Sequence, residues 1–315
     1  TWYVKRQAIF AAAGVVVMYL TSKLNYQNFR WMSIFVLAAA FVLLILVKVP
    51  HIGVTAGGAN RWIKLPGLPQ FQPSEVAKFT MILMFARLTR NYGARAEKFR
   101  FGVLGFGTAM LGILIPLALE KHLSAILLMG MVGVVMMFVA GTRARWLLAG
   151  AGAAAVFVVV YVSLMGYAGD RITAWLHPER DPGDTGYQIL QSLYAIGSGG
   201  LFGLGFGKSR QKYLYLPFQY NDYIFAVICE ELGFFGAAAI VMLLSALILR
   251  GYWIALHAQD RFSTVLASGL VTLIAVQTVL NLGVVTNLLP STGIALPFFS
   301  YGGTALAVHP STIRS

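Results

Sequence analysis

The sequence has few charged side chains and very few acidic ones. Asp, Glu, Lys and Arg together make up 11% of its 315 residues, whereas 58% are hydrophobic. A typical soluble domain has about 25% charged residues, and its core could not hide this much apolar surface. The composition therefore excludes an ordinary soluble protein and predicts a polytopic membrane protein.

The sequence also has little cysteine. Its single cysteine, Cys229, lies inside an apolar stretch, so no intrachain disulfide can form and we expect a buried, inert thiol. Strict alternation of apolar and polar residues is absent, so we predict an all-α fold. Nine apolar runs are expected to form helices: 7–22, 31–48, 75–92, 102–118, 123–141, 146–166, 222–249, 263–288 and one beginning near 294.

Acidic residues number 11 against 24 basic ones, a net charge of +13. In a soluble protein this excess would suggest nucleic acid, but here the basic residues lie mostly at the ends of apolar runs. Those in alternate connections are Lys23, Arg30, Arg87, Arg90, Arg95, Lys98, Arg100, Arg143, Arg145, Arg250 and Arg261. The positive-inside rule places these connections in the cytoplasm and predicts that 49–74 and 167–221 face outward, although five basic residues in 167–221 depart from the rule.

This orientation puts the residues before the first apolar run on the outer face. We therefore expect at least one further helix before Thr1, which is not an initiator residue. The ninth run changes abruptly to 309–315 before it is long enough to span a membrane, so we also expect the last helix to be truncated.

A lone carboxylate, Asp222, opens the apolar run 222–249. A charge at the start of a spanning helix is costly and favours a functional role. Helix capping is an equally good interpretation, because Asn221 or Asp222 could accept the first free backbone N–H groups. The local sequence leaves both open.

The first outward segment ends in a helix start. Pro73 and Ser74 favour a helix that begins there. Glu75 in its first turn can pair with Lys78 three residues later, either as a local ion pair or as part of a site. Earlier in the segment, Arg61 and Lys64 could anchor the chain to lipid headgroups.

The second outward segment combines a predicted short helix with a glycine-rich stretch. Gln188, Gln191 and Ser192 lie close on one side of that helix. The stretch 199–209 superficially resembles a phosphate-binding loop, but Phe202 stands where such a loop requires glycine. We expect its glycines to permit turns and close backbone approach to a large ligand.

Acidic residues at two other places in the sequence could be either structural or functional. Glu120 and His122 lie in a turn between apolar runs, where solvated charges are expected, and they are weak evidence for a metal. Glu230 and Glu231 lie about two turns after Asp222 and could serve polar packing or function.

Several of these pieces, in order, resemble the SEDS family (shape, elongation, division and sporulation) of integral-membrane proteins, which polymerise peptidoglycan from lipid II. The resembling pieces are 61–63, 71–78, 186–188, 191–192, 203–209, 211–212, 216–217, the segment around Asp222, and 291–303. Where the family often has Glu-Pro-Asp-Leu-Gly, this chain keeps Glu120 but not the Pro or Asp.

The resemblance implies one SEDS-type transmembrane domain over 1–315, with ten-helix architecture of which this chain lacks the first helix and truncates the last. Segment 167–221 corresponds to the large extracytoplasmic loop. Asp222 matches the acid considered essential for polymerisation, and its partial desolvation at the membrane surface would make it a useful base. The active site would face outward from the bacterial cytoplasmic membrane.

The implied reaction is inverting attack of a GlcNAc 4-hydroxyl on a lipid-linked MurNAc, with release of undecaprenyl pyrophosphate. Cations should stabilise that leaving group, and a divalent cation, Mg²⁺ or Mn²⁺, remains open, with no metal ligand assigned. The expected substrate-binding residues are Arg61, Lys64, Glu75, Lys78, Glu120, Gln188, Gln191, Ser192, Lys208, Lys212, Ser291 and Ser300, with Arg210 a further candidate cation.

A class B penicillin-binding protein, which crosslinks the glycan, is the implied partner, together with other division or elongation proteins. Two alternatives remain open: a lipid II flippase, in which Glu75, Lys78, Glu230 and Glu231 would matter more than Asp222, and a non-catalytic scaffold of the division machinery.

Overall fold

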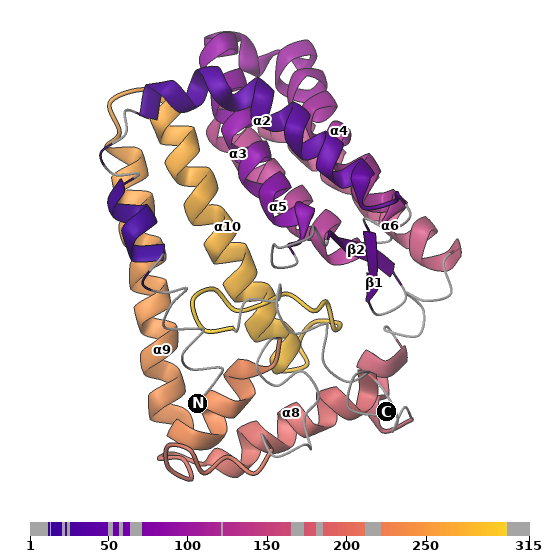
Figure 1. Ribbon diagram of the computed structural model, residues 1–315, viewed down its shortest axis with the longest axis vertical. Coiled ribbons are helices and arrows are strands. Elements are labelled where there is room, and N and C mark those ends of the chain that lie inside the picture. Colours follow the sequence, from indigo (N-terminus) through magenta and orange to yellow (C-terminus); the bar gives the residue numbers. More distant parts are fainter. Residues whose placement is uncertain are drawn as a thin grey trace.

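The computed structural model describes residues 12, 14–20, 23, 26–49, 53–56, 59–63, 71–120, 122–164, 173–180, 185–211 and 222–300. The regular secondary structure of this part of the chain is helical apart from one short hairpin, which confirms the predicted helical class (Figure 1). The longer helices are α2 (Tyr26–Leu46), α3 (Pro73–Tyr92), α4 (Phe106–Leu119), α5 (Leu123–Val139), α6 (Ala144–Leu164), α8 (Thr185–Gly199), α9 (Ile224–Leu256) and α10 (Arg261–Val285). Short 3-10 turns cover Gly93–Glu97 and Pro178–Arg180, and a π-helical turn at Arg100–Gly105 leads into α4.

Three described segments are long and apolar enough to cross a membrane: Arg100–Leu119, Ile224–Leu256 and Arg261–Val285. Trp31–Leu46 and Leu123–Val139 are shorter apolar helices. Large apolar side chains such as Ile115, Leu243 and Val279 are exposed on the surfaces of these helices. In water such surfaces would cause association, whereas in a bilayer they face lipid, so the fold is that of a membrane protein.

Helix α10 is central: it packs against α3 and α5 on one side and α9 on the other (Figure 1). Gly269 permits the close packing, because a Cβ there would lie 2.6 Å from Met136 Cε and 2.7 Å from Ile82 Cγ2. The buried core of this bundle includes Phe85, Phe106 and Met129. Lipid supplies no hydrophobic drive between helices, so this close packing is what holds them together.

The contacts between connections agree with the predicted alternation of sides. At one end, Arg143 and Glu97 form an ion pair of 3.2 Å between two connections assigned to the cytoplasm. At the other end, Ser192 of α8 donates a hydrogen bond of 2.8 Å to the carbonyl of Val285, the last residue of α10. Helix α8 lies across this end, at the foot of the view in Figure 1.

A two-stranded antiparallel hairpin was not predicted. Strand β1 (Gly53–Ala56) pairs with β2 (Ala59–Ile63), with a bulge between Val54 and Thr55. Ile63 also exchanges two backbone hydrogen bonds with Phe71, two residues before α3. Strands this short give little periodic signal in a sequence, and these lie outside the apolar runs. The hairpin fixes the position of Arg61 relative to α3.

Helix α9 is broken at Gly233, whose φ is +67° and ψ −168°. The break frees backbone groups, and the glycine-rich loop, residues 199–211, satisfies them. Its N–H groups at Leu204 and Gly205 donate to the carbonyls of Glu230 and Glu231, at 2.9 and 3.0 Å. Its carbonyls at Gly200 and Leu201 accept from the N–H groups of Phe234 and Phe235. A break inside a spanning helix is tolerated only where such groups are paired again.

This arrangement changes the interpretation of the glycines. Close backbone approach is confirmed, but the described contacts are with α9 rather than with a ligand: a Cβ on Gly203 would lie 2.2 Å from the Glu231 carbonyl oxygen. The side chain of Glu230 accepts from Ser209 Oγ and Arg210 N, and that of Glu231 from Gly207 N and Ser209 N. For Glu230 and Glu231 the sequence left polar packing and function open, and these contacts favour polar packing.

Candidate functional site

Asp222 lies just before the start of α9. The residue at the N-cap position is Tyr223, whose side chain makes no capping hydrogen bond, so Asp222 lies one position outside the cap that the sequence suggested. The helix dipole still places partial positive charge near this carboxylate. Asp222 itself is half-buried.

Asn281 of α10 joins Asp222 to a distant segment. Its amide Nδ2 donates to the carbonyl oxygens of Asp222, at 2.7 Å, and Ile294, at 2.8 Å. Asn281 is 1% exposed, so water does not compete for these bonds. Gly293 has φ +67°, and a Cβ there would lie 3.3 Å from Asp222 Oδ2. We call Asp222, Asn281 and Gly293 the Asp222 site.

The residues next to Gly293 connect the Asp222 site to the turn between α4 and α5. Ser124 donates a short hydrogen bond to the carbonyl of Thr292. On the other side, the Tyr223 hydroxyl lies 3.5 Å from Ser291 Oγ. Segment 291–294 therefore lies between Asp222 and the start of α5, and Ser291, a predicted site residue, is in contact with the start of α9.

The turn that holds Glu120 and His122 is buried, which corrects the expectation of solvated charges. Glu120 is 4% exposed and its Oε1 has no hydrogen-bond partner. His122 is partly buried, its Nε2 lies 3.4 Å from the amide nitrogen of Gln72, and its Nδ1 has no partner. Next to the turn, Ser124 of α5 contacts Thr292 from beyond α10, and the burial of Glu120 excludes the water expected at a helix connection.

Burial changes the proton affinity of both groups. It raises the pKa of Glu120 to about 7, against the opposing effect of the positive charges of Arg61 and then Lys48. Burial, together with the positive charges of Arg61 and then Lys78, lowers the pKa of His122 to about 3. At neutral pH the imidazole is therefore uncharged, and Glu120 exchanges a proton readily.

Three cations therefore act on this buried turn, from three different elements. Lys48 follows α2, Arg61 is on β2 and Lys78 is on α3. Arg61 and Lys78 were predicted as site residues. The structure places them close enough for their charges to act on the turn that holds Glu120 and His122. A group of cations around partly unpaired buried polar atoms can bind a concentrated anion such as a diphosphate.

The predicted ion pair between Glu75 and Lys78 is confirmed, with 2.7 Å between Lys78 Nζ and Glu75 Oε2. The two partners are unequally placed: the Lys78 side chain is 6% exposed and that of Glu75 is 52% exposed. Helix α3 begins at Pro73, as predicted, with Glu75 in its first turn. The positive charge of Lys78 is therefore buried, and it pairs with the carboxylate of Glu75 near the surface.

The remaining predicted residues fall into several places. Gln188 and Gln191 lie on α8, as expected for a helix, and are half-buried, while Ser192 is buried and its hydroxyl joins α8 to α10. Lys208 and Arg210 are exposed on the glycine-rich loop. Ser300 closes a turn, because its hydroxyl accepts a hydrogen bond from the N–H of Leu296. Lys64 and Lys212 lie outside the described residues.

Lys48, Gln72 and Asn281 were not predicted as site residues. Asn281 did leave a signal, because an amide inside the apolar run 263–288 is unfavourable unless it has partners. Lys48 ends the run 31–48, where a lysine is ordinarily interpreted as an interfacial anchor. Gln72 stands in the resembling piece 71–78, but nothing local distinguishes its side chain.

The described residues do not supply a ligand set for a divalent ion. Within the ranges given above, no three His, Cys, Asp or Glu side chains gather at one point. Mg²⁺ is commonly held by one or two carboxylates together with substrate phosphates. An ion near Asp222 or Glu120 would therefore be held chiefly by substrate oxygens.

These features define a class: a polytopic helical membrane protein with a carboxylate and a group of cations at one end of its bundle. The family described as cell cycle proteins, FtsW, RodA and SpoVE, matches residues 1–313. The chain belongs to this family, as the resemblance predicted.

Individual relatives are similar over most of their length. A probable peptidoglycan glycosyltransferase FtsW of Geobacter metallireducens is 42% identical over 310 residues, covering 98% of this chain and 82% of that protein. Stage V sporulation protein E of Bacillus subtilis is 40% identical, covering 98% and 84%. A solved structure, described as structural coordination of polymerization and crosslinking by a peptidoglycan synthase complex, superimposes with a TM-score of 0.79 at 30% identity, covering 97% and 85%.

Proposed function

We propose that this protein is a peptidoglycan glycosyltransferase that polymerises lipid II at the outer face of the bacterial cytoplasmic membrane. The observation that carries the proposal is Asp222, a half-buried carboxylate at the start of α9, held through its backbone by Asn281 and close to Gly293. The relatives described as glycosyltransferases support the reaction class. The ten-helix architecture of the family and a large outward loop over 167–221 are part of the same proposal.

In the proposed reaction, Asp222 accepts the proton of the 4-hydroxyl of an acceptor GlcNAc. The hydroxyl oxygen forms a bond to the anomeric carbon of the lipid-linked MurNAc, and the bond from that carbon to the diphosphate oxygen breaks. Attack opposite the leaving group inverts the anomeric centre. A carboxylate partly removed from water is a better base than a solvated one, because burial disfavours its charged form.

The departing diphosphate needs positive charge near it as the bond breaks. Arg61 and Lys78 are proposed for this role, because both lie in the neighbourhood of the buried turn that Ser124 joins to segment 291–294. Glu120, with a pKa of about 7, can buffer a proton beside them. Lys208 and Arg210 lie on the glycine-rich loop. This loop contacts α9 at Glu230, eight residues after Asp222, which is about 12 Å along the helix axis at 1.5 Å per residue.

A class B penicillin-binding protein is proposed as the partner that crosslinks the product, on the strength of the similar chain in a peptidoglycan synthase complex. The test is polymerisation of purified lipid II by the protein together with that partner. Wild type is compared with Asp222→Asn at equal folded yield. Asp260→Asn is the matched control, because Asp260 caps α10 and asparagine caps equally well.

We expect glycan strands from wild type and Asp260→Asn and none from Asp222→Asn. Equal polymerisation by Asp222→Asn would remove Asp222 from the reaction. If wild type made no strands but moved lipid II across vesicle membranes, the flippase alternative would replace the enzyme. If wild type neither made strands nor moved lipid II but still bound its partner, the scaffold alternative would replace the enzyme.

A further inference from the structure

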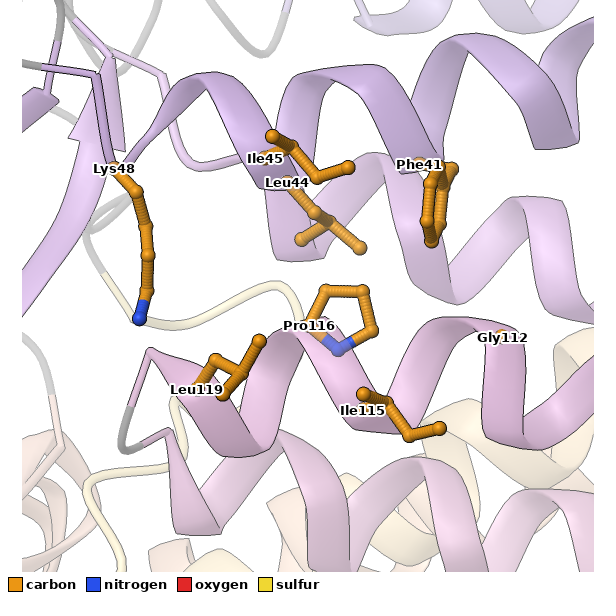
Figure 2. Close-up of a pocket in the computed structure, with 8 residues that line it drawn as sticks. All are labelled: Phe41, Leu44, Ile45, Lys48, Gly112, Ile115, Pro116 and Leu119. Atoms are coloured by element: carbon orange, nitrogen blue, oxygen red, sulfur yellow. The ribbon is translucent and has the colours of Figure 1, made fainter.

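An apolar groove of about 300 Å³ lies between α2 and α4. Figure 2 shows Phe41, Leu44 and Ile45 on the α2 side facing Ile115, Pro116 and Leu119 on the α4 side. Several of these side chains are substantially exposed, including Ile45 at 49% and Ile115 at 55%, so the groove opens toward the lipid. Walls that are apolar apart from Lys48 suit a hydrocarbon chain.

The two ends of the groove differ. Phe41 and Gly112 lie at one end, within the two helices, and Lys48 lies at the other, beyond Leu119 (Figure 2). Lys48 is seven positions after Phe41, so the groove is about 10 Å long at 1.5 Å per residue. A hydrocarbon chain in the groove would therefore have its polar end at Lys48.

The Lys48 end of the groove is connected to the Asp222 site. Leu119 is followed by Glu120, on which the charges of Lys48 and Arg61 both act. Four residues later Ser124 holds the carbonyl of Thr292, and Gly293 follows directly beside the Asp222 carboxylate. The chain thus leads from the Lys48 end of the groove, through a turn on which two cations act, to the segment beside the proposed base.

We propose that this groove holds the first isoprene units of a polyprenyl diphosphate lipid and that Lys48 contacts its diphosphate. The inference rests on the proposed function, which requires a lipid of this chemistry to lie with its diphosphate near Asp222. An ordinary phospholipid has two acyl chains and a single phosphate, so it brings less negative charge to Lys48 and Arg61 than a diphosphate does.

The groove can be filled without disturbing the fold. A Cβ added at Gly112 meets no atom within 4 Å, so Gly112→Leu places a side chain in open space inside the groove. Gly107, one and a half turns earlier on α4, is equally unobstructed and does not line the groove. Gly107→Leu is therefore a matched control for the same substitution in the same helix.

The experiment measures binding rather than turnover. The full chain in lipid nanodiscs is labelled with a photoreactive undecaprenyl diphosphate, and the labelled peptides are mapped. We expect labelling of α2 and α4, competed by unlabelled undecaprenyl diphosphate and not by phosphatidylglycerol. Gly112→Leu should weaken binding about tenfold, which corresponds to losing only about 60 Å² of apolar contact, whereas Gly107→Leu should bind as wild type does.

Lys48 is tested with Lys48→Gln and Lys48→Arg. The first should weaken binding of the diphosphate but not of undecaprenol, which lacks the anion, and the second should restore it. Labelling unaffected by Gly112→Leu, or competed equally by phosphatidylglycerol, would overturn the proposal and leave an ordinary lipid contact. Polymerisation with no labelling of the groove would overturn this inference alone, whereas specific labelling without polymerisation would overturn only the proposed reaction.

Discussion

Asn281→Leu should slow the reaction without weakening substrate binding. The amide of Asn281 donates two buried hydrogen bonds, to the carbonyls of Asp222 and Ile294. Leucine has nearly the same shape and no donor. Each bond contributes about 0.5–1.5 kcal/mol net, so the substitution removes roughly 1–3 kcal/mol that holds Asp222 against segment 291–294.

If that free energy positions the base in the transition state, kcat should fall between about fivefold and about 150-fold while KM stays near its wild-type value. Thr278→Val is the matched control. Its hydroxyl is also buried on α10, but it donates to Ile274 within the same helix and joins nothing to Asp222. Both variants are compared by lipid II polymerisation and by thermal unfolding in detergent.

Asn281→Leu should also unfold at a lower temperature, because two buried carbonyls lose their donor. The reasoning would be refuted by a variant that unfolds at a lower temperature yet keeps the kcat of wild type, since Asn281 would then serve stability alone. An equal fall of kcat in Thr278→Val would point to a general effect of changing α10.

Two further predictions concern the break in α9 and the buried turn. Gly233→Ala should lower the unfolding temperature, because a Cβ there would lie 2.3 Å from the nitrogen of Gly203 and the positive φ alone costs an alanine about 1–3 kcal/mol. The control, Gly130→Ala, adds a Cβ in open space on α5 and should be neutral or slightly stabilising. An unchanged unfolding temperature for Gly233→Ala would show that the glycine-rich loop and the break in α9 are not in close contact. Unfolding temperatures measured against pH should separate Glu120 from His122. The folded protein binds the Glu120 proton more tightly than the unfolded chain does, so this group makes stability fall as pH rises from about 4.5 to about 7, whereas His122 makes it rise from about 3 to about 6.5. Glu120→Gln should therefore leave only the rise of stability with pH, and His122→Gln only the fall. The same dependence of stability on pH in both variants would contradict the burial of the turn.

The sequence was sufficient for the helices because their signal is local. Runs of apolar residues of spanning length predict α2, α4, α5, α9 and α10 without any knowledge of their neighbours. The ion pair of Glu75 with Lys78 was also predictable, since both residues lie within one turn of α3. Asp222 stood out because a carboxylate next to an apolar run is costly.

What the sequence did not predict depends on contacts between distant residues. The turn at Glu120 was expected to be solvated, because nothing local indicates its burial or the contact of the nearby Ser124 with Thr292. In the same way, the pairing of Asn281 with both Asp222 and Ile294 joins three parts of the chain. The burial that gives Glu120 a pKa of about 7 is a property of the assembled fold.

The break in α9 shows why the glycine-rich loop and the Asp222 site should be considered together. Residues 224–232 form about two and a half turns of helix between Asp222 and Gly233, at 3.6 residues per turn. The glycine-rich loop hydrogen-bonds to the end of these turns through the side chains of Glu230 and Glu231. Asn281 holds the opposite end at Asp222. Because both ends of this short helix are fixed by other parts of the chain, it can orient the Asp222 backbone independently of the rest of α9, whose remaining turns are free to pack in the membrane.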